Sequence, residues 1–393
     1  MTSALPHPVA RLPEEWLASL SQIGERKFRA SQVFRWIHQH GVLDPSAMTD
    51  LSVALRAHLQ GEGLGPVGAI AHQHTAPDGT IKAVLRLGDD ASIETVLIPM
   101  RLEYHGPRDA EDTAAPELAS IGDADLGAID DEPDEEDVDD GTMERVTQCI
   151  SSQVGCAMKC AFCASGVPGL RRQLGAEEIV GQVLIGRSLL SPSQRLRNLV
   201  FMGSGEPLHN YEAVARAIRL LTHRQGVALS RRRITVSTVG LTDGIARLGE
   251  DFEGKVGLAV SLHAADDETR QALVPSNKRW PLASIVKALA AYPLPPRRRI
   301  TIEYALIEGR NDRLSDARKL AKLLAGLRVK INLIPMNPVD HAGFMPPAME
   351  RIQQFRMALV DAGYTCLVRK RRGDDISAAC GQLVTRLAPR GKP

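Results

Sequence analysis

The stretch GCAMKCAFCASG, residues 155–166, places three cysteines within eight residues in the pattern C-x3-C-x2-C. These cysteines are Cys156, Cys160 and Cys163. A structural zinc ion takes four ligands, and no further Cys or His stands at a tight paired spacing beside them. A cluster of four irons would use three thiolates and leave one iron open for another ligand. The spacing therefore favours a [4Fe–4S] cluster over a zinc site.

The chain beyond this loop alternates short β-rich runs with helical stretches. The runs are apolar without a two-residue alternation, which is typical of strands buried on both faces of a parallel sheet. Predicted strands cover residues 145–151, 197–203, 232–239, 255–263, 299–307, 329–336 and 364–370. Predicted helices cover residues 176–190, 211–224, 242–249, 282–292, 314–326 and 347–363. Six strand–helix units predict an α/β fold whose parallel sheet is open or partly closed as a barrel.

The residues before the loop predict a smaller α+β unit. Residues 13–60 carry apolar side chains at spacings of three and four, which predicts helices. Residues 66–99 contain three short β-rich runs, two of them joined by the turn PDGT, which predicts strands and a hairpin. We therefore predict an N-terminal domain over residues 1–100, an insertion over 101–143, a core over 144–372 and a C-terminal segment over 373–393.

Charge is distributed unevenly along the 393 residues. The net charge is +1, yet residues 109–140 contain fifteen Asp and Glu and no Lys or Arg. That run has no apolar pattern and is predicted to be a disordered insertion. The rest of the chain holds 48 basic against 32 acidic residues, which favours a polyanionic partner such as nucleic acid.

The composition argues against other classes of protein. No stretch approaches the roughly 18 apolar residues of a membrane span, and the chain begins without an apolar signal core. We therefore expect a cytoplasmic protein with no membrane partner. In a reducing compartment, the six cysteines are expected to act as ligands or catalysts rather than in structural disulfides.

Polar residues stand at the predicted ends of several strands. The glycine-rich GSGEPL, residues 203–208, permits close backbone approach, and its Glu206 could hold an ammonium group. Ser237 ends a second strand, SLH (261–263) ends a third, and Asn337 ends a fourth. One such residue alone is more often part of a turn, whereas four clusters at one edge of a sheet predict a binding site.

Eight segments of the chain together resemble the RlmN/Cfr family of radical S-adenosylmethionine methyltransferases. They are KFRASQVFRWIH (27–38), SIETVLIP (92–99), CISSQVGCAMKCAFC (149–163), GSGEPLHN (203–210), TVSTVG (235–240), SLHA (261–264), IPMNP (334–338) and RGDDISAACGQL (372–383). The resemblance covers the whole chain outside the acidic insertion. It implies a partial (β/α)6 radical-SAM barrel, preceded by a small N-terminal α+β accessory domain that contacts RNA.

The resemblance also implies two cofactors, a [4Fe–4S] cluster and S-adenosylmethionine, with two molecules of the latter used per turnover. The methionyl amine and carboxylate would bind the open iron. The residues that match cofactor-binding positions are Gly205, Glu206, Ser237, Ser261, Leu262, His263 and Asn337. The chain departs from the family pattern at Ser204, where a methionine is expected.

The activity that the family implies is methylation of adenine C2 in 23S rRNA and in tRNA beside the anticodon. Cys380 would carry a methyl group, which loses hydrogen to a cofactor-derived radical and adds to C2. Cys149 matches the thiol that then attacks the Cys380 sulfur, which releases the RNA and leaves a disulfide. Glu94 matches the acceptor of the C2 proton, although Cys149 could serve instead and Glu94 could be a solvent-facing strand residue. Cys366 matches no family role and is predicted to be a small buried hydrophobe.

Three basic clusters are natural contacts for RNA phosphates: residues 231–233, 297–299 and 369–372. We also expect an external one-electron reductant such as flavodoxin, and a monomeric chain. Two alternatives stay open: a Cfr-like enzyme that methylates adenine C8, and an iron–sulfur RNA-binding factor without catalysis. A binding factor would not need Cys149 and Cys380. A glycyl-radical activase shares the three-cysteine spacing, but the basic body and the C-terminal cysteine fit it poorly.

Overall fold

The core of the protein is a curved parallel sheet. The computed structural model describes residues 5–100, 143–337 and 343–369. The parallel strands are β4 (Glu144–Cys149), β7 (Gln194–Phe201), β8 (Ile234–Thr238), β9 (Gly257–Ser261), β10 (Ile300–Leu306), β11 (Val329–Pro335) and β12 (Cys366–Val368). They lie side by side in chain order. The strand–helix repeat predicted from the sequence is therefore present, and the predicted partial barrel is confirmed.

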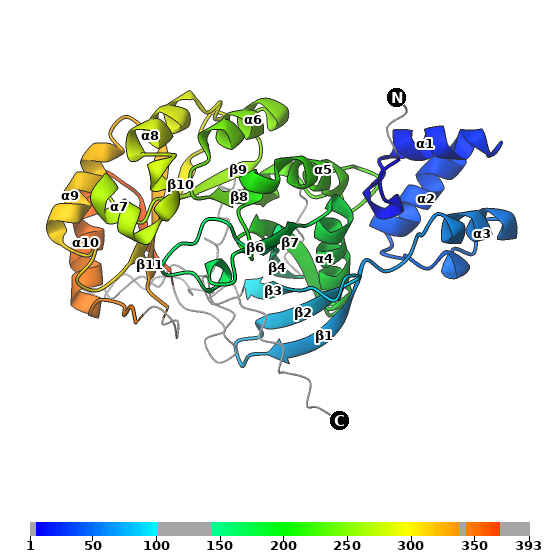
Figure 1. Cartoon of the computed structure of the whole chain (residues 1–393), viewed down its shortest axis with the longest axis horizontal. Coiled ribbons are helices and arrows are strands. Elements are labelled where there is room, and N and C mark those ends of the chain that lie inside the picture. The colour runs from blue at the N-terminus through cyan, green and yellow to red at the C-terminus, as the bar shows by residue number, and fades with distance from the viewer. Residues whose placement is uncertain (1–4, 101–142, 338–342, 370–393) are drawn as a thin grey trace, which may run out of the picture.

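Helices cover the outer side of this sheet (Figure 1). They are α4 (Ala176–Ser188), α5 (Tyr211–Leu221), α6 (Thr242–Phe252), α8 (Leu282–Ala291), α9 (Leu314–Leu323) and α10 (Met349–Asp361). In α5, Val214, Ala217, Ile218 and Leu221 recur at spacings of three, one and three, and each is almost fully buried. That spacing places the apolar side chains on one stripe facing the sheet, which is why these segments fold as covering helices.

A two-stranded sheet and a helix escaped the sequence analysis because they are short and polar. The strands β5 (Gln153–Gly155) and β6 (Leu170–Gln173) form a small antiparallel sheet that brackets the cysteine loop. The short helix α7 (Asp267–Leu273) follows β9 directly. Both contain too few apolar residues for a periodic pattern to be recognised.

The N-terminal unit differs from the expectation in one respect. Its helices α1 (Pro13–Gln22), α2 (Phe28–His38) and α3 (Val53–Gly61) lie at one end of the molecule, as Figure 1 shows. Its strands β1 (Gly68–Thr75), β2 (Ile81–Leu87) and β3 (Ser92–Met100) do not form a sheet of their own. They continue the core sheet, because β3 pairs antiparallel with β4. The predicted domain boundaries stay a prediction, but the sheet itself runs across the one at residue 100.

Alternation along the strands decides which side chains face inward. In β10, Tyr304 points to the helices and packs on Phe355 of α10, with 5.3 Å between the ring centroids. Glu303 and Ala305, its neighbours on either side, line the inner pocket. Strand side chains alternate between the two faces of a sheet, so polar residues at these positions are directed into the barrel.

Some predictions fall outside the described residues. These are the acidic insertion, Cys380, residues 370–372 of the last basic cluster and the C-terminal segment. Within the described ranges, no helix combines the length and apolar character that crossing a membrane requires. Cys366 is 3% exposed and belongs to the main apolar core, so its prediction as a buried hydrophobe is confirmed.

Candidate active site

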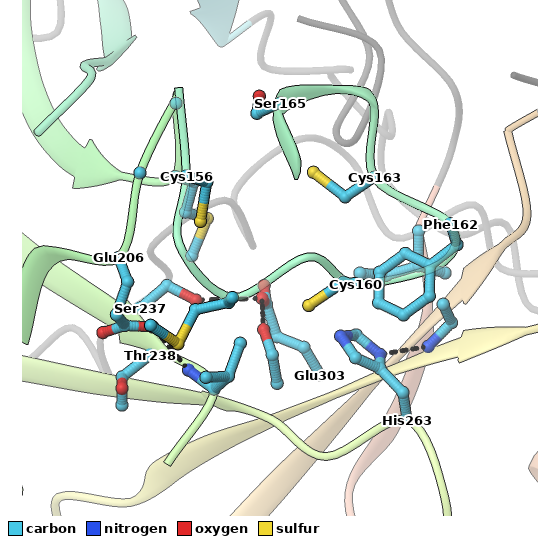
Figure 2. A pocket seen from close by; sticks show the side chains of 18 of the residues that line it. Cys156, Cys160, Phe162, Cys163, Ser165, Glu206, Ser237, Thr238, His263 and Glu303 are labelled. Atoms are coloured by element: carbon cyan, nitrogen blue, oxygen red, sulfur yellow. Dashed lines mark hydrogen bonds between the residues drawn. The ribbon is translucent and has the colours of Figure 1, made fainter. Parts of the chain in front are cut away.

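A pocket of about 150 Å³ lies where the parallel strands end (Figure 2). The three loop cysteines line it, together with residues from the ends of β7, β8, β9, β10 and β11. Six of the seven residues predicted to bind the cofactor are in this lining: Gly205, Glu206, Ser237, Ser261, His263 and Asn337. The seventh, Leu262, is fully buried and is not part of the lining. Segments far apart in the sequence thus converge at the predicted edge of the sheet.

Backbone geometry shapes the cysteine loop. Gly155 has φ +77°, and a Cβ there would come within 1.9 Å of the Gly169 carbonyl oxygen. Glycine is therefore required where the loop leaves β5. The Cys156 amide donates to that same carbonyl at 3.2 Å, and the Ala161 amide donates to the carbonyl of Leu273 at 2.9 Å. The start of the loop is therefore bonded to the residue before β6, and its middle is bonded to the last residue of α7.

Two of the loop cysteines have raised pKa values, so their neutral thiol forms are favoured in the absence of a positive charge. Burial raises the pKa of Cys156 to about 12, and nearby Glu206 and Cys163 raise it further. Burial and the two neighbouring thiols raise the pKa of Cys160 well above its usual value. Such thiols become thiolates when a metal centre lies among them.

The donor set fits the cluster that the sequence predicted. Within the described ranges, no three His, Cys, Asp or Glu side chains are close enough together to hold a single metal ion. In a [4Fe–4S] cluster each thiolate binds a different iron, so the three sulfurs do not need to surround one point. Cys156, Cys160 and Cys163 would hold three irons of such a cluster.

Glu206 is a buried carboxylate with neutral hydrogen-bond donors. Its Oε2 accepts from the Val239 amide at 2.9 Å, and its Oε1 accepts from the Leu208 amide at 3.1 Å. Burial raises its pKa to about 7, and these amides oppose the shift. Gly205 before it has φ +107°, and a Cβ there would lie 2.6 Å from Gln153, so the close approach requires glycine. The carboxylate is thereby fixed at the wall of the pocket.

Ser204 stands where the family pattern has methionine. Its hydroxyl lies 3.1 Å from the hydroxyl of Ser165 in the cysteine loop. The departure thus replaces an apolar side chain with a polar contact between the end of β7 and the loop. Glu206 is unaffected by it, because Glu206 is held by Val239 and Leu208.

His263 is a neutral ring at the opposite side of the pocket from Glu206 (Figure 2). Burial lowers its pKa to about 3, and Arg270 lowers it further. Its Nδ1 accepts from the Ala305 amide at 2.9 Å, so its proton is on Nε2. The ring packs edge-on against Phe162 of the cysteine loop, with 4.6 Å between centroids.

Sequence reasoning missed two charged residues at this site. Glu303 of β10 lines the pocket. Arg270 of α7 is fully buried behind the pocket wall and donates to the carbonyls of Leu262, Trp280, Val239 and Ser261 and to Asn277 Oδ1. It thereby joins the ends of β8 and β9. A single Glu in an apolar strand and a single Arg in a short helix give no motif, so no sequence signal could have found them.

The predicted catalytic residues Glu94 and Cys149 lie on neighbouring strands. Val96 pairs directly with Cys149 across β3 and β4, and Glu94 is two positions before Val96. All three therefore project to the same face. Cys149 packs with Val96, Ile98, Val200 and Met202, and Met202 also lines the pocket. The face with Glu94 and Cys149 is thus connected to the cysteine pocket through Met202.

Glu94 is buried rather than solvent-facing. It is 2% exposed, and its Oε1 lies 2.8 Å from Nζ of Lys82 on β2. Burial raises the pKa of Glu94, and Lys82 opposes that shift. Its Oε2 has no hydrogen-bond partner among the described residues. This carboxylate therefore keeps one oxygen available to accept a proton.

Two predicted basic clusters lie far from the pocket. Residues 231–233 immediately precede β8, and residues 297–299 precede β10. The pocket forms at the opposite ends of these strands. Arg231 lies 3.7 Å from Glu253, and Arg299 donates to Thr365 Oγ1 at 2.7 Å. Any contacts these clusters make with RNA would be remote from the cofactor pocket.

Comparison with known proteins agrees with this geometry. Residues 150–324 match the model of the radical SAM superfamily, and residues 14–62 match that of the ribosomal RNA large subunit methyltransferase N-terminal domain. A radical SAM methyltransferase from Sphaerobacter thermophilus has a similar structure, with a TM-score of 0.80 and 39% identity over 95% of this chain and 98% of that one. Fold, cysteine pocket and these likenesses define a radical SAM enzyme, which uses a [4Fe–4S] cluster and S-adenosylmethionine.

Curated relatives make the assignment more specific. The dual-specificity RNA methyltransferase RlmN of Sorangium cellulosum is 59% identical over 98% of this chain and 97% of its own length. The protein of the same name from Marinobacter nauticus is 41% identical over 95% of this chain and 91% of its own length. The chain therefore belongs to the RlmN family.

Proposed function

We propose that this protein methylates C2 of adenine in 23S rRNA and in tRNA beside the anticodon. The observation that carries the proposal is the convergence of three partly buried thiols, Glu206 and the strand-end hydroxyls in one pocket. That pocket belongs to a chain 59% identical to a dual-specificity RNA methyltransferase over nearly its whole length. Support also comes from Cys149, which packs with Met202, a residue of the pocket lining.

In this proposal, the pocket residues bind and orient the cofactors. Cys156, Cys160 and Cys163 would hold three irons of the cluster and leave the fourth for S-adenosylmethionine. Glu206 lies close enough to Cys156 to influence its pKa, so it is placed to receive the amine. When bound, the cluster would supply the one-electron chemistry that S-adenosylmethionine cleavage requires. Buried walls such as Phe201 and Met336 exclude water from the pocket.

The residues on β2, β3 and β4 then complete the transfer. Glu94 accepts the C2 proton on Oε2, while Lys82 balances the carboxylate charge at Oε1. The Cys149 thiolate attacks the sulfur of Cys380 and breaks its bond to the methylene carbon on the RNA. That carbon takes up a proton and becomes the methyl group, while the two sulfurs form a disulfide. Cys149 lies in an apolar cluster, so it would react only with a sulfur brought against that cluster.

The proposal includes partners and setting. The substrate is a large RNA, contacted by the N-terminal domain and the basic clusters. An external one-electron reductant such as flavodoxin supplies an electron to the cluster. The chain acts as a cytoplasmic monomer.

Mass spectrometry of cellular RNA tests the proposed function. A deletion strain should lack 2-methyladenosine in 23S rRNA and tRNA, and the wild-type gene should restore it. The Cys156→Ala variant should not restore it, whereas Cys366→Ala should, because Cys366 lies in the core away from the pocket. Loss of 8-methyladenosine instead would assign the Cfr-like reaction, and unchanged RNA would favour a binding factor.

A further inference from the structure

Arg270 is a fully buried arginine in the helix that supports the cysteine loop. It lies on α7, and the Ala161 amide of the loop donates to the carbonyl of Leu273 at the end of that helix. Nη2 of Arg270 donates to the carbonyl of Val239. Val239 and Cys160 both pack against the small apolar cluster that contains Leu273. The guanidinium and a predicted cluster ligand therefore approach the same few side chains.

The charge of Arg270 is surrounded by neutral groups. Its guanidinium donates only to backbone carbonyls and to one amide oxygen among the described residues: Leu262, Val239, Ser261, Trp280 and Oδ1 of Asn277. None of these acceptors is a carboxylate. A buried cation that is solvated by dipoles alone remains costly, and a negative group nearby would lower that cost.

Cys160 is the group with negative charge that acts most strongly on Arg270. Burial lowers the pKa of Arg270 to about 10, and Cys160 opposes this shift more than Asp267 does. The influence is mutual, because burial and the neighbouring thiols raise the pKa of Cys160 whereas Arg270 lowers it. Asp267 already accepts from the Asn277 side chain at 3.0 Å and from the Leu282 amide at 2.9 Å. The charge of Arg270 is thus directed mainly at the cysteine loop.

The pocket itself provides no comparable cation. Among its described lining residues there is no Lys or Arg, and the pKa of His263 is lowered to about 3, so that ring is neutral. Three thiolates outnumber the two positive charges of an oxidised [4Fe–4S] cluster, and one electron from an external reductant makes the cluster more negative still. A fixed buried cation stabilises the more negative form to the greater extent. No proton moves in this step, since the guanidinium stays charged.

We propose that Arg270 raises the reduction potential of the [4Fe–4S] cluster and thereby eases its reduction by the external electron donor. The inference depends on the cluster of the radical SAM class and not on which adenine carbon is methylated. Arg270 acts through its charge, while its bonds to the strand-end carbonyls fix the position of that charge. The residue thus has a structural effect through its hydrogen bonds and a separate effect on the cluster through its charge.

A redox titration of the cluster-loaded protein, followed by electron paramagnetic resonance without cofactor or RNA, tests the proposal. In Arg270→Gln, the ratio of reduced to oxidised cluster at a fixed applied potential should fall about 10-fold, which for a one-electron couple is a shift of about 59 mV to lower potential. Arg270→Lys keeps the charge and should stay closer to the wild type. Arg279→Met removes an exposed arginine shortly after α7 and should leave the potential unchanged. Iron content and thermal unfolding establish that each variant is loaded and folded.

A further variant separates charge from structure. Asn277→Ala removes one hydrogen bond of Arg270 but keeps its charge, so it should lower the unfolding temperature without lowering the potential. Water entering a loosened wall would stabilise the more negative reduced cluster and raise the potential, which is the opposite sign. Arg270→Met is the second neutral variant, with the same expected fall, should Arg270→Gln fail to load iron. An unchanged or higher potential in the neutral variants would overturn the proposal, as would an equal fall in Asn277→Ala.

Discussion

Two regions of the molecule hold buried carboxylates and balance their charge differently. In the cysteine pocket, Glu206 is held by backbone amides and Glu303 by serine hydroxyls, and the described lining has no Lys or Arg. On the face formed by β2 and β3, Glu94 is paired with Lys82 at 2.8 Å. The first region uses neutral donors, whereas the second has its own cation.

This difference matches the chemistry proposed for each region. The pocket contains carboxylates and thiols, and its described lining has no Lys or Arg. A cationic cofactor and a metal cluster would balance the negative charge of these groups. Lys82 already balances the negative charge of Glu94. Glu94 is therefore suited to accept a proton from an uncharged adenine. The proposed function therefore assigns cofactor cleavage to the pocket and completion of the transfer to the β2–β4 face.

The largest effect should come from removing a cluster ligand. Cys160→Ala should reduce iron from about four atoms per chain to nearly none, with complete loss of S-adenosylmethionine cleavage. Iron analysis and cleavage assays on anaerobically reconstituted protein measure both. The matched control is Cys366→Ala, which removes a buried thiol outside the pocket and should keep its iron. Tetrahedral zinc in the wild type would contradict the cluster assignment.

Removing the thiol on the β2–β4 face should stop the reaction at a later stage. Cys149→Ala should retain iron and cofactor cleavage but release almost no product, because no thiolate resolves the adduct. A covalent protein–RNA species should then survive denaturation on a gel. The double variant Cys149→Ala, Cys380→Ala should lose that species. Normal turnover by Cys149→Ala would remove the distinction between the two regions.

Arg270 should dominate the stability of the pocket wall. Arg270→Met leaves the carbonyls of Leu262, Val239 and Ser261 without their donor, so the free energy of unfolding should fall by about 3–5 kcal/mol. Urea unfolding measures the change. The control Arg247→Met removes an exposed pair with Glu212 and should cost about 1 kcal/mol or less. Equal losses in the two variants would show that Arg270 does not hold the strand ends together.

The smallest effect should appear when the balancing cation is removed. Lys82 holds the pKa of Glu94 down against burial, so Lys82→Met should raise that pKa further. Glu94 would then stay protonated to higher pH, and the acidic limb of the pH–rate profile should move up by about one pH unit. Raising the pH should restore the rate, and Lys82→Arg should leave the profile unchanged. An unmoved limb would argue that Cys149 is the base.

Much of the fold was predictable because its signals are local. Apolar runs without alternation predicted the buried parallel strands, and helical spacing predicted their covering helices, including α5. The cysteine spacing predicted a common site for three thiols, which the pocket lining brings together. The polar residues at the ends of β7, β8, β9 and β11 were expected at one edge, since parallel strands end on the same side.

Other features depend on contacts between distant segments and have no local pattern. The strands β1, β2 and β3 continue the core sheet because β3 pairs with β4. Residues 101–143 separate these two strands in the chain. The same pairing buries Glu94 and brings it to the face that carries Cys149. Burial raises the pKa of Glu94, so its suitability as a base is also a property of the fold.

The sequence by itself determined the three thiols, because spacing along the chain fixes which ligands can meet in one short loop. The class of protein and the cofactor pair followed from the resemblance of its motifs to a known family. Only the tertiary structure decided the roles open to Glu303 and Arg270, each a single charged residue in an ordinary-looking segment. Parallel register placed Glu303 beside Ser261 and near Ser237, and chain packing directed Arg270 to the carbonyls behind them. The physical reason is that charge and hydrogen bonding depend on three-dimensional neighbours, which sequence spacing does not record.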